Sequence, residues 1–562
     1  MVSGLSRACL TRVRTRLPRA ATLAGDLIDG SLRLSDKYQD AETRSRLDAS
    51  ALLVRSLSQP GVFEHAVDDY RVIATHISWI VLTGDYAYKI KKPVAFDFLD
   101  FSTLELRRRY CEEELRLNQR YAPGIYLDVV AIRGSADTPR LHGEGPAIEY
   151  AVRMKQFAQA SLLSAHASAS TLARKTIDAM AQRVADLHAV AARALPGDRF
   201  GHAANVQRLS QDNLDALATS VPVVSTSAAL RRLCDWYRGY PDLVQRLEQR
   251  LHDGYVRDCH GDLHLGNMAL IDGEVMPFDC IEFNPELRWI DVISESAFVA
   301  MDLEERGYSG YAWRFISRYL EQADDYDGID LLRYYVVYRA LVRAKVEVLR
   351  VSESGHSAPD AYSTALDYIG LADRWAGRRQ PGLVLMHGLS GSGKSTVAER
   401  LVETLGAIQL RSDVVRKRLH GLAAASDSHS TPGGNIYTAD ASAATYRRLA
   451  ELAACVVAAG FRVIVDATFL QRGQRETLLQ LTAGGALPCV AVHCSAPMET
   501  LRARILARDN DPSEANLQVL EWQLERQQAP SLEENGLRAI VNVGEPGLDS
   551  AHIDRIERLL AG

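Results

Sequence analysis

Apolar and polar positions in the first part of the chain follow a pattern that predicts paired strands. The segments Arg71–Leu82 and Tyr86–Pro93 are rich in β-branched and aromatic side chains, and the turn Thr83-Gly84-Asp85 separates them. A helix is predicted from Ser102 to about Tyr121, because apolar side chains recur there at helical spacing. Further strands are predicted at 124–134 and 147–156, followed by a mostly helical stretch at 158–252.

The middle of the chain contains a short hairpin, and an alternation of strands and helices follows further on. Two short apolar runs flank Asp272-Gly273, a dipeptide typical of tight hairpin turns. Further on, Gly382–His387 is a continuous apolar run that precedes a glycine-rich segment and a helical one. Another apolar run, Phe461–Val465, ends in an aspartate. Buried strands that alternate with helices are typical of an α/β domain with a mostly parallel sheet.

The chain of 562 residues is too long for one hydrophobic core, which indicates two or three domains. Small and polar residues with one proline, from Ser352 to Asp360, mark the best boundary. The two halves carry different patterns, so the chain is predicted to be a fusion rather than a duplication. The predicted parts are a partly disordered or helical extension (1–58), a first domain (59–351), a linker with a helix (352–380) and a second domain (381–562).

Charge and cysteine content exclude several classes of protein. A net charge of −6 and a pI near 6.2 give no overall basic field, so no nucleic-acid partner is expected. The eight cysteines are scattered without a CxxC pair, which argues against a zinc site or a disulfide framework. No run of 18 apolar residues is present, so no membrane partner is expected either. A reducing cytoplasm fits best.

Residues 1–25 are unusual in composition. They contain five arginines and no Asp or Glu, which matches a transit peptide. The alternative, which we favour, is a disordered or over-extended N-terminus in an Ala- and Arg-rich proteome.

The segment from residue 260 to 279 has the clearest chemistry of the first half. It places Asp262 five residues before Asn267, and Asp279 follows after the predicted hairpin. An ordinary hairpin with polar loops is the alternative, but the joint match with His260 in a strand-loop-strand context makes that alternative poor. His260 is interpreted as a structural residue that braces the loop.

This segment resembles the small-molecule branch of the protein-kinase-like fold, the aminoglycoside phosphotransferase and choline-kinase-like enzymes. The sequence departs from the protein-kinase pattern at Gly261 and Cys280. The resemblance implies an α+β kinase-like domain in which Asp262 accepts or orients the proton of the attacking hydroxyl. It also implies that Asn267 and Asp279 hold Mg²⁺ ions that bridge the phosphates of ATP.

The same resemblance implies a lysine on the second strand that contacts the α- and β-phosphates. Strand alternation places Lys89 and Lys91 on one face, so both are candidates and Lys89 is preferred. Glu113 or Glu114 of the following helix is a candidate partner for this lysine. The alternatives are solvated charges on an edge strand and on a helix.

A second and unrelated site follows the apolar run at 382–387. The segment Gly388-Leu389-Ser390-Gly391-Ser392-Gly393-Lys394-Ser395 is a P-loop, and Thr396 continues into the helix. Glycines let the backbone wrap around phosphate, and successive N–H groups at a helix N-terminus bind it. In this motif the lysine reaches the β- and γ-phosphates and the serine hydroxyl reaches Mg²⁺.

Three further elements of the second half resemble P-loop small-molecule kinases of the gluconate-kinase and zeta-toxin type. Asp466 resembles the Walker-B aspartate that supports Mg²⁺, although a helix-capping aspartate is the alternative. The resemblance implies that Asp413 activates the acceptor hydroxyl and that Arg416 grips acceptor or phosphate. It also implies that Arg504 and Arg508 form a lid that stabilises the transferred phosphoryl group, the alternative being a solvated basic face.

Together these motifs predict a kinase-like α+β domain followed by an α/β P-loop domain. The predicted function is ATP-dependent phosphorylation of hydroxyl groups on small-molecule acceptors, with two nucleotide sites that both need Mg²⁺. One alternative makes the first domain a metabolite-binding regulatory module that controls a single P-loop kinase or NTPase. Another makes the P-loop half an NTPase switch or a toxin-like kinase.

Overall fold

The computed structural model describes residues 41–561 apart from 97–98, 241, 354–358, 378–380, 424–435, 437, 484, 508–516 and 546. The interpretation of residues 1–25 therefore lies outside the described residues. The chain packs into two compact units. The first comprises Met1–Gln119, Pro123–Ala160 and Ser164–Thr171, and the second comprises Arg120–Ala122, Ser161–Leu163 and Leu172–Gly562. The domain division at 352–380 remains a prediction.

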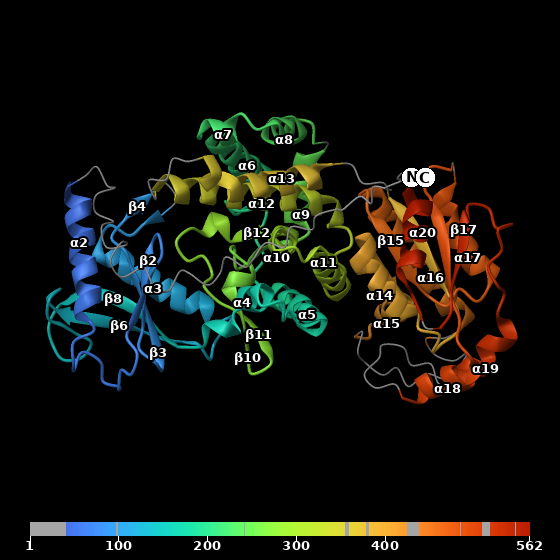
Figure 1. Cartoon of the computed structure of the whole chain (residues 1–562), viewed down its shortest axis with the longest axis horizontal. Helices are drawn as coiled ribbons and strands as arrows, with labels where there is room; N and C mark the ends of the chain where they lie inside the picture. Colours follow the sequence, from blue (N-terminus) through green and yellow to red (C-terminus); the bar gives the residue numbers. More distant parts are fainter. Residues whose placement is uncertain are drawn as a thin grey trace, which may run out of the picture. The chain divides into compact units, whose positions relative to one another are not determined.

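The first unit is built on a six-stranded antiparallel sheet with the order β1-β2-β3-β8-β6-β7 (Figure 1). Tyr88 and Ile90 of this sheet pack in an apolar cluster with Leu53 of the helix Ala41–Ser56. The alternate residues Lys89 and Lys91 bond to Glu114 of the helix Leu104–Asn118. Because successive side chains of a strand point to opposite faces, these two helices cover opposite sides of the sheet. The elements are α2 (Ala41–Ser56), β1 (Arg71–Ala74), β2 (Ser78–Leu82), β3 (Tyr86–Lys91), β4 (Ala95–Phe96), β5 (Leu99–Asp100), α3 (Leu104–Asn118), β6 (Tyr126–Gly134), β7 (Pro139–Arg140), β8 (Ala147–Lys155) and α4 (Leu163–Ser168).

The prediction of one continuous strand over Arg71–Leu82 is wrong. The chain turns after Ala74 and forms the antiparallel neighbours β1 and β2, with Ala74 paired to Trp79. The hydroxyl of Thr75 accepts a hydrogen bond of 2.9 Å from the backbone N–H of Ser78. A threonine side chain that bonds local backbone in this way competes with strand continuation, and β-propensity alone does not reveal the break.

Helices dominate the next part of the chain, residues 172–376, which we call the helical subdomain. Its helices are α5 (Arg174–Val190), α6 (Ala203–Ala218), α7 (Pro222–Ser225), α8 (Ala228–Arg238), α9 (Leu243–His252), α10 (Val292–Glu305), α11 (Ser309–Ala323), α12 (Ile329–Glu353) and α13 (Ser363–Ala376). Two short antiparallel pairs interrupt them, β9 (Val256–Asp258) with β12 (Trp289–Asp291), and β10 (Met268–Ile271) with β11 (Glu274–Pro277). Asp272 and Gly273 have φ angles of 52° and 86°, as a tight hairpin turn requires, so the predicted hairpin is confirmed.

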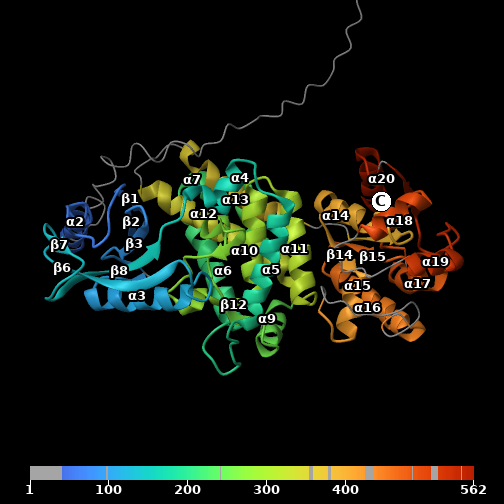
Figure 2. The ribbon, with the colours of Figure 1, turned by 90° about the horizontal axis from the view of Figure 1, so that it is seen from below.

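The P-loop subdomain, residues 381–561, contains a five-stranded parallel sheet with the order β14-β15-β13-β16-β17. Helices α14 and α16 pack on β14 and β15 (Figure 2). The predicted fold class is confirmed in its architecture, because an α+β part with an antiparallel sheet precedes an α/β part with a P-loop and a parallel sheet. The elements are β13 (Gly382–His387), α14 (Lys394–Leu405), β14 (Ala407–Arg411), α15 (Ser412–Leu419), α16 (Ala439–Ala458), β15 (Arg462–Asp466), α17 (Arg472–Leu479), β16 (Cys489–Cys494), α18 (Met498–Leu506), α19 (Leu517–Arg526), β17 (Ala539–Val543) and α20 (Ser550–Ala561).

None of the helices in the described part of the chain is long and apolar enough to cross a lipid bilayer.

Candidate functional site

The two strand lysines of the first unit share one carboxylate. Lys89 and Lys91 each place the side-chain nitrogen 2.8 Å from a different oxygen of Glu114 on α3. Burial opposes ionisation of Glu114, but the two ammonium groups outweigh it and hold its pKa at about 2. The candidate pairing of a strand lysine with Glu114 is therefore present, whereas Glu113 pairs with Arg116 at 2.7 Å. Both lysines remain candidates for contact with nucleotide.

Replacing Glu114 with Gln is expected to destabilise the first unit by about 3 kcal/mol at neutral pH, because two buried cations lose their anion. The folded pKa of about 2 lies below the ordinary 4.5, so this stabilisation is complete above pH 4.5 and is lost as the pH falls toward 2. Hydrogen exchange of α3 at pH 7 and pH 3.5 measures the difference from wild type, which should shrink at the lower pH. A difference that is equal at both pH values contradicts the assignment. Glu112→Gln, an exposed carboxylate on the same helix, is the matched control.

The predicted catalytic loop of the helical subdomain is folded around Asp262. The side-chain amide of Asn267 donates to the Asp262 carboxylate and to its backbone carbonyl, each at 3.0 Å. His264 lies 3.5 Å from the same carboxylate. Burial opposes ionisation of Asp262, but His264 and its hydrogen bond hold the pKa well below the usual range. Asp262 is therefore an anion at neutral pH that is already oriented by two neighbours.

The loop and the hairpin that follows are bonded to each other. The ring of His260 contacts the carbonyl of Phe278 at 2.8 Å, and the backbone N–H of Phe278 donates to the carbonyl of Asn267 at 3.0 Å. The next residue, Asp279, has a φ of 64°, in the left-handed region that costs a non-glycine residue free energy. Strain of this kind persists where the surrounding structure fixes the backbone, so the position of Asp279 is strongly determined. The structural interpretation of His260 agrees with these contacts.

Two buried carboxylates of α10 also hold the loop, and the sequence reasoning missed both. Glu295 accepts from the backbone N–H of Gly261 at 2.7 Å, and Asp302 accepts from that of Leu265 at 2.9 Å. They lie seven residues apart on a helix that is otherwise mostly apolar and fully buried over its first twelve residues. The sequence signal that could have revealed them is a pair of acidic residues on one face of a mostly apolar helix. Asp291 caps the start of α10 by accepting a hydrogen bond of 2.8 Å from the backbone N–H of Ile293.

The P-loop connects β13 to α14 as the motif requires. Three of its glycines, at positions 388, 391 and 393, have positive φ angles of 141°, 83° and 87°. A side chain at Gly388 would meet the carbonyl oxygen of Cys494 at 2.3 Å, so only glycine fits there. Lys394 is the first residue of α14, and its side-chain nitrogen donates to the carbonyl of Leu389 at 2.8 Å.

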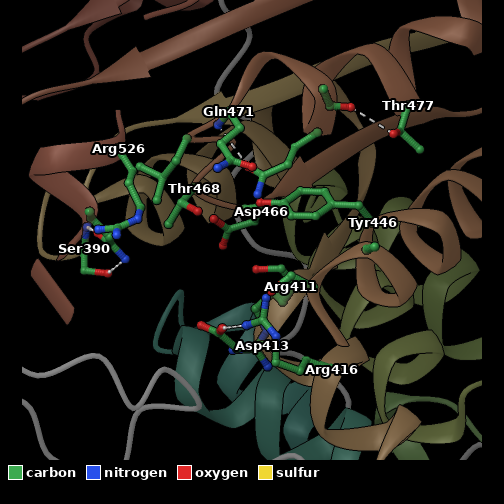
Figure 3. A pocket seen from close by; sticks show the side chains of 18 of the residues that line it. Ser390, Arg411, Asp413, Arg416, Tyr446, Asp466, Thr468, Gln471, Thr477 and Arg526 are labelled. Carbon is green, nitrogen blue, oxygen red and sulfur yellow. Dashed lines mark hydrogen bonds and ion pairs between the residues drawn. The ribbon is translucent and has the colours of Figure 1, made fainter. Parts of the chain in front are cut away.

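A cavity of about 850 Å³ opens beside the P-loop. It is lined by residues from the P-loop (Ser390, Lys394, Ser395), from the β14–α15 junction (Arg411, Ser412, Asp413, Arg416), from the end of β15 (Asp466, Ala467, Thr468) and from α16, α17 and α19. Figure 3 shows Asp413 and Arg416 on one side of this space and Asp466 with Thr468 and Gln471 across from them. The structure thus brings the predicted nucleotide-side and acceptor-side residues to one cavity.

Asp466 lies at the carboxyl end of β15 with two polar neighbours. The side-chain amide of Gln409 donates to it at 3.0 Å, and Ser395 makes a further hydrogen bond. Burial raises the pKa of Asp466, although Lys394 and the bond from Ser395 act in the opposite direction. Oxygen donors from Ser395 and Asp466 are the ligand type that Mg²⁺ prefers, so this pair fits a magnesium site.

Of the remaining predicted residues, Asp413 and Arg416 line the cavity and Arg504 does not. Asp413 and Arg416 form an ion pair of 3.2 Å one turn apart on α15. Arg504 donates to the carbonyl of Gly391 at 3.3 Å and pairs with Glu545 at 3.1 Å. It therefore braces the back of the P-loop and does not belong to the described lining of the cavity. Arg508 lies outside the described residues.

The sequence reasoning also missed a brace inside the P-loop subdomain. The side-chain oxygen of Gln523 on α19 accepts from the backbone N–H of Ser390 at 2.8 Å, and its amide donates to the Ser390 hydroxyl at 2.9 Å. These residues are separated by 133 positions, so no local pattern links them.

Comparisons with known proteins agree with the P-loop geometry. A family model described as an AAA domain matches residues 383–530, and this match confirms the predicted P-loop domain. The uncharacterized protein Rv2004c of Mycobacterium tuberculosis (strain ATCC 25618 / H37Rv) is 31% identical over 446 residues, which cover 79% of this chain and 87% of that protein. The uncharacterized protein Mb2027c of Mycobacterium bovis (strain ATCC BAA-935 / AF2122/97) matches with the same identity and coverage.

Two solved structures illustrate the range of the structural likenesses. A gluconokinase from Sinorhizobium meliloti 1021 is 26% identical and covers 33% of this chain and 92% of its own, with a TM-score of 0.23. An ethanolamine kinase from Plasmodium vivax is 11% identical and covers 60% of this chain and 90% of its own, with a TM-score of 0.36.

Proposed function

This chain belongs to the family of the uncharacterized mycobacterial proteins Rv2004c and Mb2027c, and we propose that it is an ATP-dependent phosphotransferase that acts on a small-molecule hydroxyl group. One observation carries the proposal. Lys394 of the P-loop and the carboxylate of Asp413 line the same cavity, so a nucleotide and an acceptor have adjoining places. A cavity of about 850 Å³ has the volume of a small-molecule site.

On the nucleotide side, the backbone N–H groups of the P-loop and the side chain of Lys394 bind the phosphates. The Ser395 hydroxyl and the Asp466 carboxylate would hold Mg²⁺, which when bound neutralises charge on the phosphate oxygens. Gln409 keeps one oxygen of Asp466 in a hydrogen bond and thereby fixes how the carboxylate is turned.

On the acceptor side, Asp413 takes the proton of the attacking hydroxyl. The acceptor oxygen forms a bond to the γ-phosphorus, the bond from that phosphorus to the ADP oxygen breaks, and the hydroxyl proton passes to Asp413. Arg416, 3.2 Å from Asp413, orients the carboxylate.

We extend the proposal to the loop of the helical subdomain as a second nucleotide site. Asp262 is held ionised by His264 and is oriented by Asn267, which matches the part of a proton acceptor or hydroxyl-orienting group. Asn267 and Asp279 offer oxygen ligands for Mg²⁺. The alternative is that the domain carrying Asp262 binds a metabolite and regulates a single working P-loop site. Such a binding module would not need Asp262, Asn267 and Asp279 together.

Replacing Asp413 with Asn is expected to lower acceptor-dependent ATP turnover by about 10²- to 10⁴-fold, because the variant cannot accept the hydroxyl proton. Nucleotide binding at the P-loop should be unchanged. The measurement is ADP release in the presence of a panel of sugars, sugar acids and amino alcohols. Asp554→Asn, the same chemical change at an exposed position of α20, is the control. ATP hydrolysis that no acceptor in the panel stimulates and that Asp413→Asn leaves intact contradicts the proposal and favours an NTPase switch.

A further inference from the structure

Helix α11 of the helical subdomain packs along β14, the edge strand of the P-loop sheet. The backbone N–H of Gln409 in β14 donates to the side-chain hydroxyl of Ser317 in α11 at 3.0 Å, and both residues are buried. An edge strand has outward N–H groups that find no partner in the sheet, so an element that buries the edge has to supply one. Ser317 therefore supplies the partner for one outward N–H group of β14.

Two side chains of β14, those of Gln409 and Arg411, connect this strand to residues of the cavity and of α11. Gln409 donates from its side-chain amide to Asp466 at 3.0 Å. Arg411, which ends the strand and lines the cavity, donates from Nε to the carboxylate of Glu321 at 2.6 Å and from a second nitrogen to the other carboxylate oxygen. A two-point bond between a guanidinium and a buried carboxylate fixes the direction of both groups. Glu321 thus sets where Arg411 points beside Asp413 (Figure 3).

Helix α15, which carries Asp413, is itself bonded to the C-terminal end of α11. Arg418 donates to the backbone carbonyls of Glu321 and Gln322 and pairs with Asp324 at 3.1 Å. Carbonyls in the last turn of a helix lack partners within the helix, and an arginine is a suitable donor for them. In the sequence, Asp413 therefore lies between Arg411 and Arg418, which both bond to the C-terminal end of α11.

We propose that Glu321 and Ser317 are positioning residues for the P-loop phosphoryl-transfer site, contributed by the helical subdomain. They hold Gln409, which bonds to the proposed magnesium ligand Asp466, and Arg411, the N-cap residue of α15, the helix that carries the proposed base Asp413. This inference rests on the proposed function of the P-loop site. It makes the helical subdomain a structural part of that site rather than a neighbour of it.

The same helix supports the loop of the other candidate site. The hydroxyl of Tyr319, between Ser317 and Glu321 in sequence, lies 2.8 Å from the ring of His188. His188 in turn lies 2.8 Å from Glu295, which accepts from the backbone N–H of Gly261. A shift of α11 would therefore move the supports of both sites together.

Glu321→Gln is expected to raise the Mg²⁺ concentration for half-maximal binding of a fluorescent ATP analogue by about tenfold, a typical effect of losing a residue behind a metal ligand. The variant leaves the partly buried Arg411 cation without its anion, and Asp466 lies close enough to Arg411 to interact with it electrostatically. Arg411 then competes with Mg²⁺ for that carboxylate. The quantity measured is the component of binding that Lys394→Ala removes, so that it reports on the P-loop site of the full-length protein.

Two further variants separate positioning from loss of structure. Glu321→Gln combined with Arg411→Gln removes the unpaired cation, so the Mg²⁺ midpoint should return toward the wild-type value, whereas a purely structural role predicts no recovery. Ser317→Ala should shift the midpoint in the same direction as Glu321→Gln by about twofold to threefold, as expected for the loss of one neutral hydrogen bond.

The control is Arg174→Gln, which removes the exposed Arg174 from its ion pair of 2.7 Å with Glu403 in the same interface without touching the cavity and leaves Glu403 paired with Arg314. It should leave the Mg²⁺ midpoint unchanged. Wild-type midpoints in both Glu321→Gln and Ser317→Ala overturn the inference. The absence of any Lys394-dependent binding in the wild-type protein is a different result, and it contradicts the proposed function itself.

Discussion

Lys394→Ala is expected to lower acceptor-dependent ATP turnover by about 10²- to 10³-fold, the usual effect of removing a donor aimed at developing charge. Lys394 begins α14 and lies in the cavity wall, where a cation contacts the β- and γ-phosphates in this motif. The neutral variant keeps the glycine backbone but lacks the cation that contacts the phosphates, so nucleotide binding at the P-loop should also be lost at the concentrations used in the titration. Steady-state turnover and titration with a fluorescent ATP analogue measure the two effects separately.

The matched control is Lys175→Ala, the same change at an exposed position of α5. It should leave turnover unchanged, because Lys175 lies far along the chain from the P-loop and does not line the cavity. Equal turnover in Lys394→Ala and wild type would show that the P-loop subdomain does not catalyse the measured reaction.

Arg250→Ala is expected to have the largest effect on stability. The Arg250 guanidinium is fully buried, donates to Asp291 at 2.7 Å from two nitrogens, and donates to Asp325 at 2.6 and 2.8 Å. Removal leaves two buried carboxylates without their cation, which typically costs about 3–5 kcal/mol. Asp291 also caps α10, the helix whose carboxylates hold the Asp262 loop. Loss of stability should therefore be accompanied by weaker nucleotide binding at that loop.

Urea unfolding followed by circular dichroism measures the expected loss. The control is Arg238→Ala, whose ion pair with Asp235 is exposed on both sides and contributes at most about 1 kcal/mol. A midpoint for Arg250→Ala within the range of this control contradicts the assignment of Arg250 as the main electrostatic support of the helical subdomain.

The parts of the structure that the sequence predicted are those in which fold and chemistry are adjacent in the chain. The P-loop is the clearest case, because β13, the glycine turn and α14 follow one another directly and the predicted strand has the observed bounds. The hairpin at Asp272-Gly273 is another, since its turn conformation depends on two neighbouring residues.

The parts that it missed depend on contacts between distant segments. Gln523 reaches Ser390 across 133 positions, and Glu321 reaches Arg411 across 90. Strand β14 was missed for a related reason. Its short run Ala407–Arg411 includes Gln409, a polar residue that looks unsuited to a buried strand until its bond to Asp466 is known. Periodicity reports which face is buried but not which distant side chain satisfies a polar group there.

The roles of individual residues also divide into those that neighbouring residues determine and those that distant contacts determine. The sequence placed Lys89 and Lys91 on one face by alternation, and the structure bonds both to Glu114, which alternation could not select over Glu113. The lid interpretation of Arg504 came from helical spacing, whereas its observed contacts are with the carbonyl of Gly391 and with Glu545. Spacing along a helix defines a face but not the group that the face meets.

The central claim is that one chain carries two nucleotide sites of unrelated design. Calorimetric titration of a Mg²⁺-bound non-hydrolysable ATP analogue into the full-length protein, into Lys394→Ala and into Asp279→Ala tests it most directly. The account predicts two sites per wild-type chain, one of which is lost in each variant. A single wild-type site that disappears only in Lys394→Ala would contradict it and would leave the kinase-like domain as a regulatory module.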